Sequence, residues 1–136
     1  MQGLEKNIAL FRENCGSGNF RVKVAAFLCG EDLVVVIAGG TRYHVGAVAM
    51  AQPRPSLADP AMISASASVL CVPGHKEDEL AREVALKMAS LLNRNVTVTA
   101  GIHLDDASET DVEQLKQNCL KAVGKLVLRV SGKENG

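Results

Sequence analysis

The stretch FRVKVAAFLCGEDLVVVIAGG, residues 20–40, decides the fold of this chain. Its first half alternates apolar and polar side chains, which predicts a half-buried strand. A tight turn, Gly30-Glu31-Asp32, follows it. Residues 33–38, LVVVIA, form a continuous run of mostly β-branched side chains, typical of a strand that is covered on both faces. Together the two runs predict a β-hairpin.

The rest of the chain combines further strands with two amphipathic helices. Strands are predicted at residues 45–51, 62–72 and 95–100, and residues 7–13 fit either a short strand or a helical turn. Residues 52–60 hold three prolines and should be irregular. Helices are predicted over residues 77–93 and from Ser108, a good N-cap, to about Val123, with residues 126–130 either extending that helix or forming a strand.

This order predicts an α+β (α/β) fold with a single mixed β-sheet of five to six strands and two helices packed on one face. The strand after the first helix should run parallel to the strand before it. We expect residues 1–136 to form one domain, with residues 1–14 and 131–136 peripheral. Two helices cannot cover both faces of such a sheet, so the doubly apolar run at residues 33–38 predicts a homodimer.

Composition narrows the class of protein. Hydrophobic residues make up 47% of the chain and aromatic residues only 3%, so the core must be aliphatic. The formal net charge is zero, which argues against nucleic-acid binding. No apolar run approaches the ~20 residues that span a bilayer, and the N-terminal segment lacks the pattern of a signal peptide. We therefore expect a cytoplasmic protein with no membrane partner. Its four cysteines stand singly, and buried small hydrophobes are expected rather than a zinc site.

The three histidines, His44, His75 and His103, all lie in segments predicted to be glycine-bearing loops. His44 belongs to GGTRYHVG, His75 to PGHKED and His103 to AGIHLDD. Glycine lets the backbone approach a ligand closely, because no Cβ stands in the way. Ordinary polar loop residues are the alternative interpretation of any one of them. For three of three we predict a shared pocket.

Two of these segments favour an anion. Gly74-His75-Lys76 precedes a helix N-terminus, which suits a phosphate, and Gly39-Gly40-Thr41-Arg42 offers backbone amides, a hydroxyl and a guanidinium. Neither is a P-loop or a dinucleotide fingerprint, and a plain turn at Gly39-Gly40 remains an alternative. A metal held by His75, His103 and Asp105 is a further alternative. No recognisable motif supplies a catalytic nucleophile.

Three segments carry a resemblance to a known family. GGTRYHVGAV, GHKEDELAREVALKMASLLN and VTVTAGIHLDDAS resemble the LpdD-like prenylated-flavin chaperones, over roughly Phe20 to Cys119. These are small accessory subunits associated with gallate and protocatechuate-type decarboxylases. The resemblance implies a carrier or maturation factor for prenylated FMN (or FMN) that supports a prenylated-flavin-dependent aromatic acid decarboxylase.

The resemblance also implies a set of cofactor contacts. They are Gly39, Gly40, Thr41, His44, Gly46, His75, Lys76, Gly101 and His103, with Arg42 or Lys76 placed to meet the phosphate. Two other interpretations stay open. One is a small enzyme that acts on a phosphate-bearing or flavin ligand with histidine acid–base residues. The other is a purely structural subunit of a decarboxylase.

Overall fold

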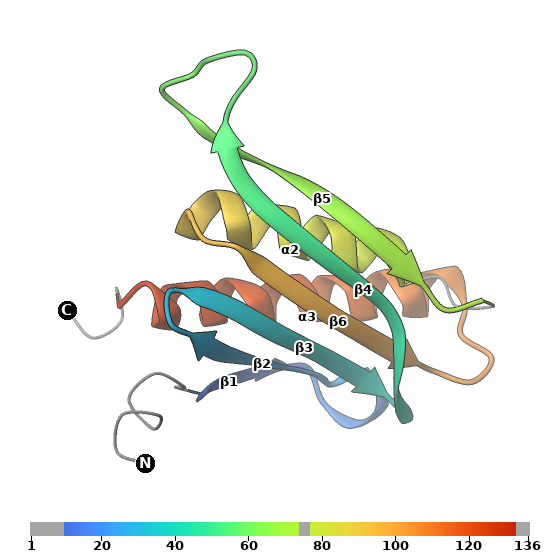
Figure 1. Cartoon of the computed structure of the whole chain (residues 1–136). Coiled ribbons are helices and arrows are strands. Elements are labelled where there is room, and N and C mark those ends of the chain that lie inside the picture. The colour runs from blue at the N-terminus through green and yellow to red at the C-terminus, as the bar shows by residue number, and fades with distance from the viewer. Residues whose placement is uncertain (1–9, 74–76, 133–136) are drawn as a thin grey trace.

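Six strands form one mixed sheet, and two α-helices cover one of its faces (Figure 1). This computed structural model describes residues 10–73 and 77–132 of the chain. The strand order is β1-β2-β3-β6-β4-β5. In chain order the elements are β1 (Leu10–Cys15), the short 3-10 helix η1 (Gly18–Phe20), β2 (Val22–Cys29), β3 (Asp32–Gly40), β4 (Arg42–Pro55), β5 (Ile63–Cys71), α2 (Asp78–Leu92), β6 (Val96–His103) and α3 (Glu109–Val130). The predicted α+β class is confirmed.

The predicted hairpin is present as β2 and β3, which pair antiparallel along their whole length. Alternate residues of β3, beginning with Leu33, are buried beneath the helices. Val34 and Val36 point to the opposite face and are partly exposed. Within the single chain, residues 33–38 are therefore covered on one face, because α2 and α3 pack on the same side. Cover of the other face by a second subunit stays a prediction.

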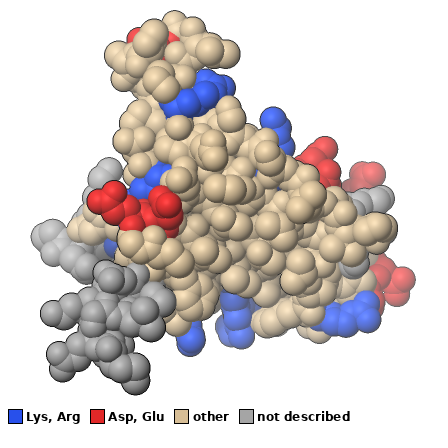
Figure 2. Space-filling view, in the orientation of Figure 1, with Lys and Arg blue, Asp and Glu red and all other residues tan. Residues whose placement is uncertain are grey.

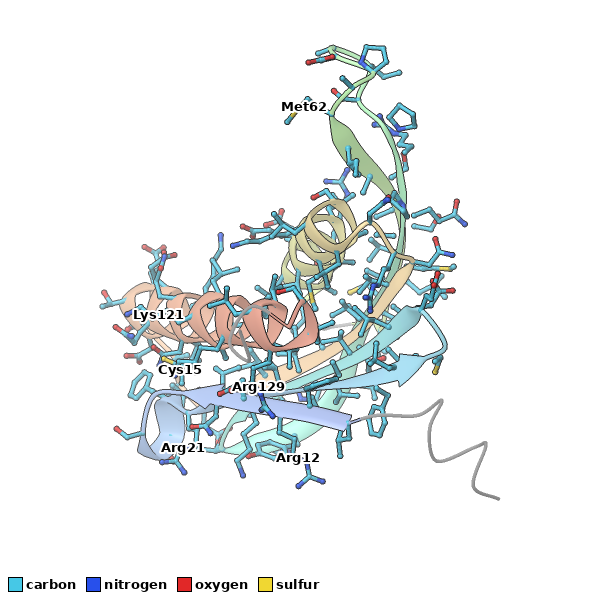
Figure 3. All side chains as sticks on the ribbon, turned by 90° about the vertical axis from the view of Figure 1, so that its left-hand side faces the viewer. Arg12, Cys15, Arg21, Met62, Lys121 and Arg129 are labelled. Atoms are coloured by element: carbon cyan, nitrogen blue, oxygen red, sulfur yellow. The ribbon has the colours of Figure 1, made fainter. Side chains whose placement is uncertain are left out.

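β4 extends well beyond residues 45–51, and the prediction that residues 52–60 are wholly irregular is wrong. β4 continues to Pro55, which still pairs with β5. Pairing with β6 stops at Ala51, so one edge of β4 has no neighbouring strand beyond that point. Proline has no N–H to donate and is tolerated at such an edge. β4 and β5 thus project past the sheet as a two-stranded arm, with Met62 near its tip (Figure 3).

β6 lies between β3 and β4, parallel to the former and antiparallel to the latter. Because β5 is also antiparallel to β4, β5 and β6 run in the same direction, as predicted for the strands on either side of the first helix. They are not neighbours, however, because β4 lies between them. The chain therefore crosses over β4 through α2, and the carboxyl ends of β3 and β6 meet at one edge of the sheet.

The predicted helices are both present. α2 matches its predicted range, and α3 continues to Val130, so residues 126–130 extend the helix. Ser108 caps α3 in a capping box: its hydroxyl accepts from the Asp111 amide, and the Asp111 carboxylate accepts from the Ser108 amide. Of the two alternatives predicted for the N-terminal segment, a short strand or a helical turn, the structure shows a strand, β1.

The core lies between the sheet and the helices and is aliphatic, as the composition predicts. α2 buries the alanines Ala81, Ala85 and Ala89 against a sheet whose β4 buries Ala47, Ala49 and Ala51. Small side chains on both elements let the helix axis approach the sheet closely. The larger members are Leu33, Ile37, Met88 and Leu126.

The cysteines differ from the prediction that they are buried. Cys119 is buried in α3, but Cys29 and Cys71 are exposed and Cys15 is half-buried. Cys29 and Cys71 are the last residues of β2 and β5. Burial, with a smaller contribution from Glu83, raises the pKa of the Cys119 thiol to about 12.

Thiol labelling should separate these cysteines. We expect Cys71 to react with an alkylating reagent in the native protein and Cys119 to react only after unfolding, because its thiolate is inaccessible and disfavoured. Labelling under native and denaturing conditions, followed by peptide mass spectrometry, measures this. Equal rates for the two residues in the native protein would contradict the packing of α3.

Candidate functional site

The β3–β4 connection at the sheet edge is a tight turn rather than the predicted loop. β3 ends at Gly40, β4 begins at Arg42, and only Thr41 lies between them. Gly40 has a φ of 77°, and a Cβ there would collide with the carbonyl of His103. That carbonyl accepts from the Thr41 amide at 2.7 Å and from the Thr41 hydroxyl at 3.2 Å. The turn is therefore bonded directly to the end of β6.

A bulge in β4, between Tyr43 and Ala47, sets the position of the first histidine. Gly101 of β6 faces this bulge, and a Cβ at Gly101 would collide with the carbonyl of His44. A Cβ at Gly46 would collide with the carboxylate of Glu77. Neighbouring protein atoms thus explain why glycine stands at both positions. Direct contact of these glycines with a cofactor stays a prediction.

The structure brings His44 and His103 together. Their ring centroids lie 6.2 Å apart in an edge-to-face arrangement. Both residues are in strands, β4 and β6, so the prediction that they lie in loops is wrong. The strands are longer than predicted because backbone pairing at this edge continues to the turn at Thr41. The other predicted members, His75 and Lys76, lie outside the described residues.

Each imidazole is hydrogen-bonded to a carboxylate. His44 Nε2 lies 2.8 Å from Glu77 Oε1, and His103 Nε2 lies 2.7 Å from Asp105 Oδ1. Glu77 directly precedes α2, where the acidic cluster of the sequence was interpreted only as a complement to the helix dipole. Its role as a histidine partner was missed, because it lies 33 positions after His44 in the sequence and no local signal links the two residues.

The Nε2 atom of His103 also lies 3.2 Å from a guanidinium nitrogen of Arg42. One ring nitrogen cannot donate to Asp105 and accept from Arg42 at the same time. The shorter distance favours donation to Asp105. The hydrogen bond from His103, the charge on His103 and a smaller contribution from Arg42 lower the pKa of the Asp105 carboxyl, so Asp105 is ionised at neutral pH.

A cavity of about 410 Å³ opens beside His103, between the N-terminal halves of α2 and α3 and the end of β6. Its volume lies within the ~300–1,000 Å³ typical of small-molecule sites. Its apolar wall comes from Leu80, Ile102, Leu104 and Leu115. Its polar lining comes from Glu77, Glu79, Glu83, His103 and Lys116.

The two helices contribute side chains to this cavity that sequence reasoning did not identify. Lys116 of α3 lies 3.6 Å from Glu83 of α2 and so forms an ion pair across the two helices. Leu115, next to it, is buried against the core. Helical periodicity identified neither residue as a site residue, because only the packing of α3 against α2 shows which turns meet.

The comparisons with known proteins agree with the resemblance in the sequence. Residues 16–131 match the model of the prenylated flavin chaperone LpdD-like domain. The chain belongs to the LpdD-like family. Within this LpdD-like domain lie every strand from β2 to β6, both α-helices and all the residues of the cavity. No curated protein matches the chain.

A solved structure shares the fold of this LpdD-like chain. It is a chain from the crystal structure of a novel chaperone complex for yeast 20S proteasome assembly. The sequences of the two chains are 16% identical, and the TM-score of their structures is 0.57. The match covers 96% of the LpdD-like chain and 99% of the other chain. At this identity the likeness shows the fold alone.

The metal alternative has little geometric support in the described part of this LpdD-like chain. Within residues 10–73 and 77–132, no group of three His, Cys, Asp or Glu side chains is placed to hold a metal ion. Of the three residues considered as ligands, His103 and Asp105 are hydrogen-bonded to each other and His75 is not described.

None of the described helices is long and apolar enough to cross a membrane.

Proposed function

We propose that this LpdD-like chain binds prenylated FMN (or FMN) in the cavity beside His103 and delivers it to a prenylated-flavin-dependent aromatic acid decarboxylase. The observation that carries the proposal is a half-apolar cavity of ligand size, next to two carboxylate-bound imidazoles, in a chain of a flavin-chaperone family. We further propose that the protein acts in the cytoplasm as a homodimer.

The lining of the cavity fits the ring system of a flavin better than its phosphate. Ile102, Leu104 and Leu115 supply an apolar surface for the ring. For the polar atoms of the ring, Lys116 supplies a hydrogen-bond donor and His103 supplies either a donor or an acceptor. Prenylated FMN, when bound, would supply the decarboxylation chemistry in the partner enzyme. This chain would bind it, orient it and limit its contact with water.

The phosphate is better placed outside the cavity. Glu77, Glu79 and Glu83 all line the cavity, and their carboxylates would repel a phosphate inside it. The guanidinium of Arg42 lies outside, at the Thr41 turn and within 3.2 Å of His103. We therefore assign the phosphate to Arg42 and Thr41, with Lys76 as the third predicted contact. The earlier expectation of a phosphate at the start of α2 is weakened by the acidic residues there.

A carrier fits the site better than an enzyme does. His44 and His103 are the acid–base groups, and both are already hydrogen-bonded to carboxylates. The enzyme interpretation keeps one supporting feature, because an imidazole held by a carboxylate is a common general base.

Spectroscopy tests the proposal directly. The protein, purified from cells that make prenylated FMN, should carry a visible absorbance, and titration with FMN should quench the fluorescence of the flavin. A colourless protein that leaves flavin fluorescence unchanged would refute the carrier proposal. Conversion of more than one equivalent of flavin per chain would favour the enzyme. A stoichiometric complex with a decarboxylase, without bound flavin, would favour the structural subunit.

A further inference from the structure

The face of the sheet that neither α2 nor α3 covers is broad and largely apolar. The strand registers align its outward side chains in two rows across all six strands. One row is Leu10, Phe27, Val34, Thr97, Met50 and Ser68, and the other is Arg12, Ala25, Val36, Thr99, Val48 and Leu70. We call these two rows the open face. Figure 3 shows the sheet edge-on, with both helices on the opposite side.

We propose that a second copy of this chain covers the open face, sheet against sheet, with the two-fold axis parallel to the strands. The proposal names the surface and the symmetry of the homodimer proposed above. It does not rest on flavin binding, because the cavity lies on the other side of the sheet.

The first argument is the chemistry of the open face. Among its members Phe27, Val34, Val36 and Met50 are large apolar side chains that the isolated chain leaves partly exposed. In the space-filling view of this face, the charged side chains of the described residues gather at the margins and leave the centre uncharged (Figure 2). Soluble monomers rarely expose a continuous apolar patch larger than ~300–600 Å².

The second argument is area. Six strands about 4.8 Å apart, each with about eight residues at about 3.3 Å per residue, give a face of roughly 750 Å² per copy. Stable specific interfaces bury about 800 Å² per partner. One full sheet face stacked on another therefore meets the requirement for a stable dimer, without any contribution from the helices.

The third argument is charge, and it selects the axis. Arg12, on β1, is the only charged residue of the two rows. A two-fold axis perpendicular to the strands would stack β1 of one copy on β1 of the other, so that the two Arg12 side chains would face each other. An axis along the strands stacks β1 on the partner's β5, so that each row meets the same row of the partner and Arg12 lies opposite the uncharged Leu70. Stacked sheets also prefer strand directions within about 30° of each other.

This symmetry has a consequence for function. The helices of both copies lie on the outer faces of the dimer, and each cavity opens between α2 and α3, away from the interface. Both cavities also lie at the same end of the dimer, because a rotation about an axis parallel to the strands does not change a residue's position along that axis. A dimer would therefore hold two ligands independently and present both to partners.

Sedimentation velocity tests the interface. At micromolar concentration the wild-type chain should sediment as a dimer. Val36→Asp should raise the dimer dissociation constant by about 100-fold or more, because the symmetry buries two carboxylates at once. Val36 is 39% exposed in the single chain, so the substitution leaves the core intact, which circular dichroism would verify. Met50→Lys, at a site 44% exposed on β4, is a second variant with the same expected result.

A matched control lies on the helix layer. Leu91 of α2 is 60% exposed, and Leu91→Asp should leave the dimer unchanged. A wild-type chain that is monomeric, or a dimer that dissociates with Leu91→Asp and survives Val36→Asp and Met50→Lys, would overturn the proposal. A monomer that still binds flavin would refute only this inference, and a dimer that ignores flavin would refute only the carrier function.

A second substitution tests the axis. Ser68→Asp places a carboxylate on β5, opposite the partner's Leu10 and one row away from the partner's Arg12. We expect the dimer dissociation constant to fall or stay constant, and Ser68→Lys to raise it. If Ser68→Asp weakens the dimer as much as Ser68→Lys does, β5 faces its own copy and the axis is wrong.

Discussion

Gly101→Ala should destabilise the protein by about 3 kcal/mol or more, because the new Cβ would occupy the place of the His44 carbonyl. The His44 carbonyl is a backbone group and a Cβ is fixed in place by the backbone, so no side-chain rotation relieves the overlap. β4 would have to move away from β6 at the bulge, and the edge-to-face arrangement of His44 and His103 would be lost. Urea-induced unfolding followed by circular dichroism measures the free energy.

The same substitution elsewhere supplies the control. Gly124 lies inside α3, and no atom lies within 4 Å of a Cβ built there. Gly124→Ala should therefore stabilise the protein by about 0.5–1 kcal/mol, because alanine loses less backbone entropy in a helix. Equal unfolding free energies for wild type and Gly101→Ala would show that β4 and β6 are not as close at the bulge as described.

His103→Ala should weaken flavin binding by about 10- to 100-fold and shift the melting temperature by only a few degrees. Its side chain is 32% exposed and its partner Asp105 is 77% exposed, so the contact that is lost is exposed and of small energetic value. The imidazole lines the cavity, and its loss removes a polar contact to the ligand. Fluorescence titration with FMN and differential scanning fluorimetry measure the two effects.

His44→Ala should behave differently and so serves as a comparison. Its side chain is 20% exposed and Glu77 is 12% exposed, so the variant removes a hydrogen bond from a largely buried carboxylate. We expect both flavin affinity and stability to fall. Gln117→Ala, on the exposed side of α3, should change neither. If His103→Ala binds FMN as tightly as Gln117→Ala does, the ligand does not occupy this cavity.

Local patterns in the sequence predicted the elements well. Period-two alternation and a glycine turn identified β2 and β3, and helical spacing identified α2 almost to the residue. These signals are local, because each element presents one face to a common core. The strand ends were predicted poorly: β4 includes Pro53 and Pro55, and β6 includes Gly101 and His103. Proline and glycine normally mark loops, and only the neighbouring strands determine whether they are tolerated.

The candidate site could be predicted only in part. Glycine-bearing segments singled out His44 and His103, and the structure places them 6.2 Å apart between ring centroids. The partner carboxylate Glu77 and the cavity wall from Leu115 were not identified. They come from α2 and α3, whose contacts depend on how far each helix is shifted along the sheet. No residue pattern along the chain encodes that shift.

The sequence by itself determined the class of fold, the aliphatic core and the family, because composition, periodicity and motifs are properties of the chain. The tertiary structure alone decided that β6 inserts between β3 and β4, and this insertion brings two histidines and two glycines to one edge. Strand order depends on which backbone donors and acceptors meet across long intervals of sequence. Steric fit at Gly40 and Gly101, together with the positive φ of Gly40, makes that arrangement possible.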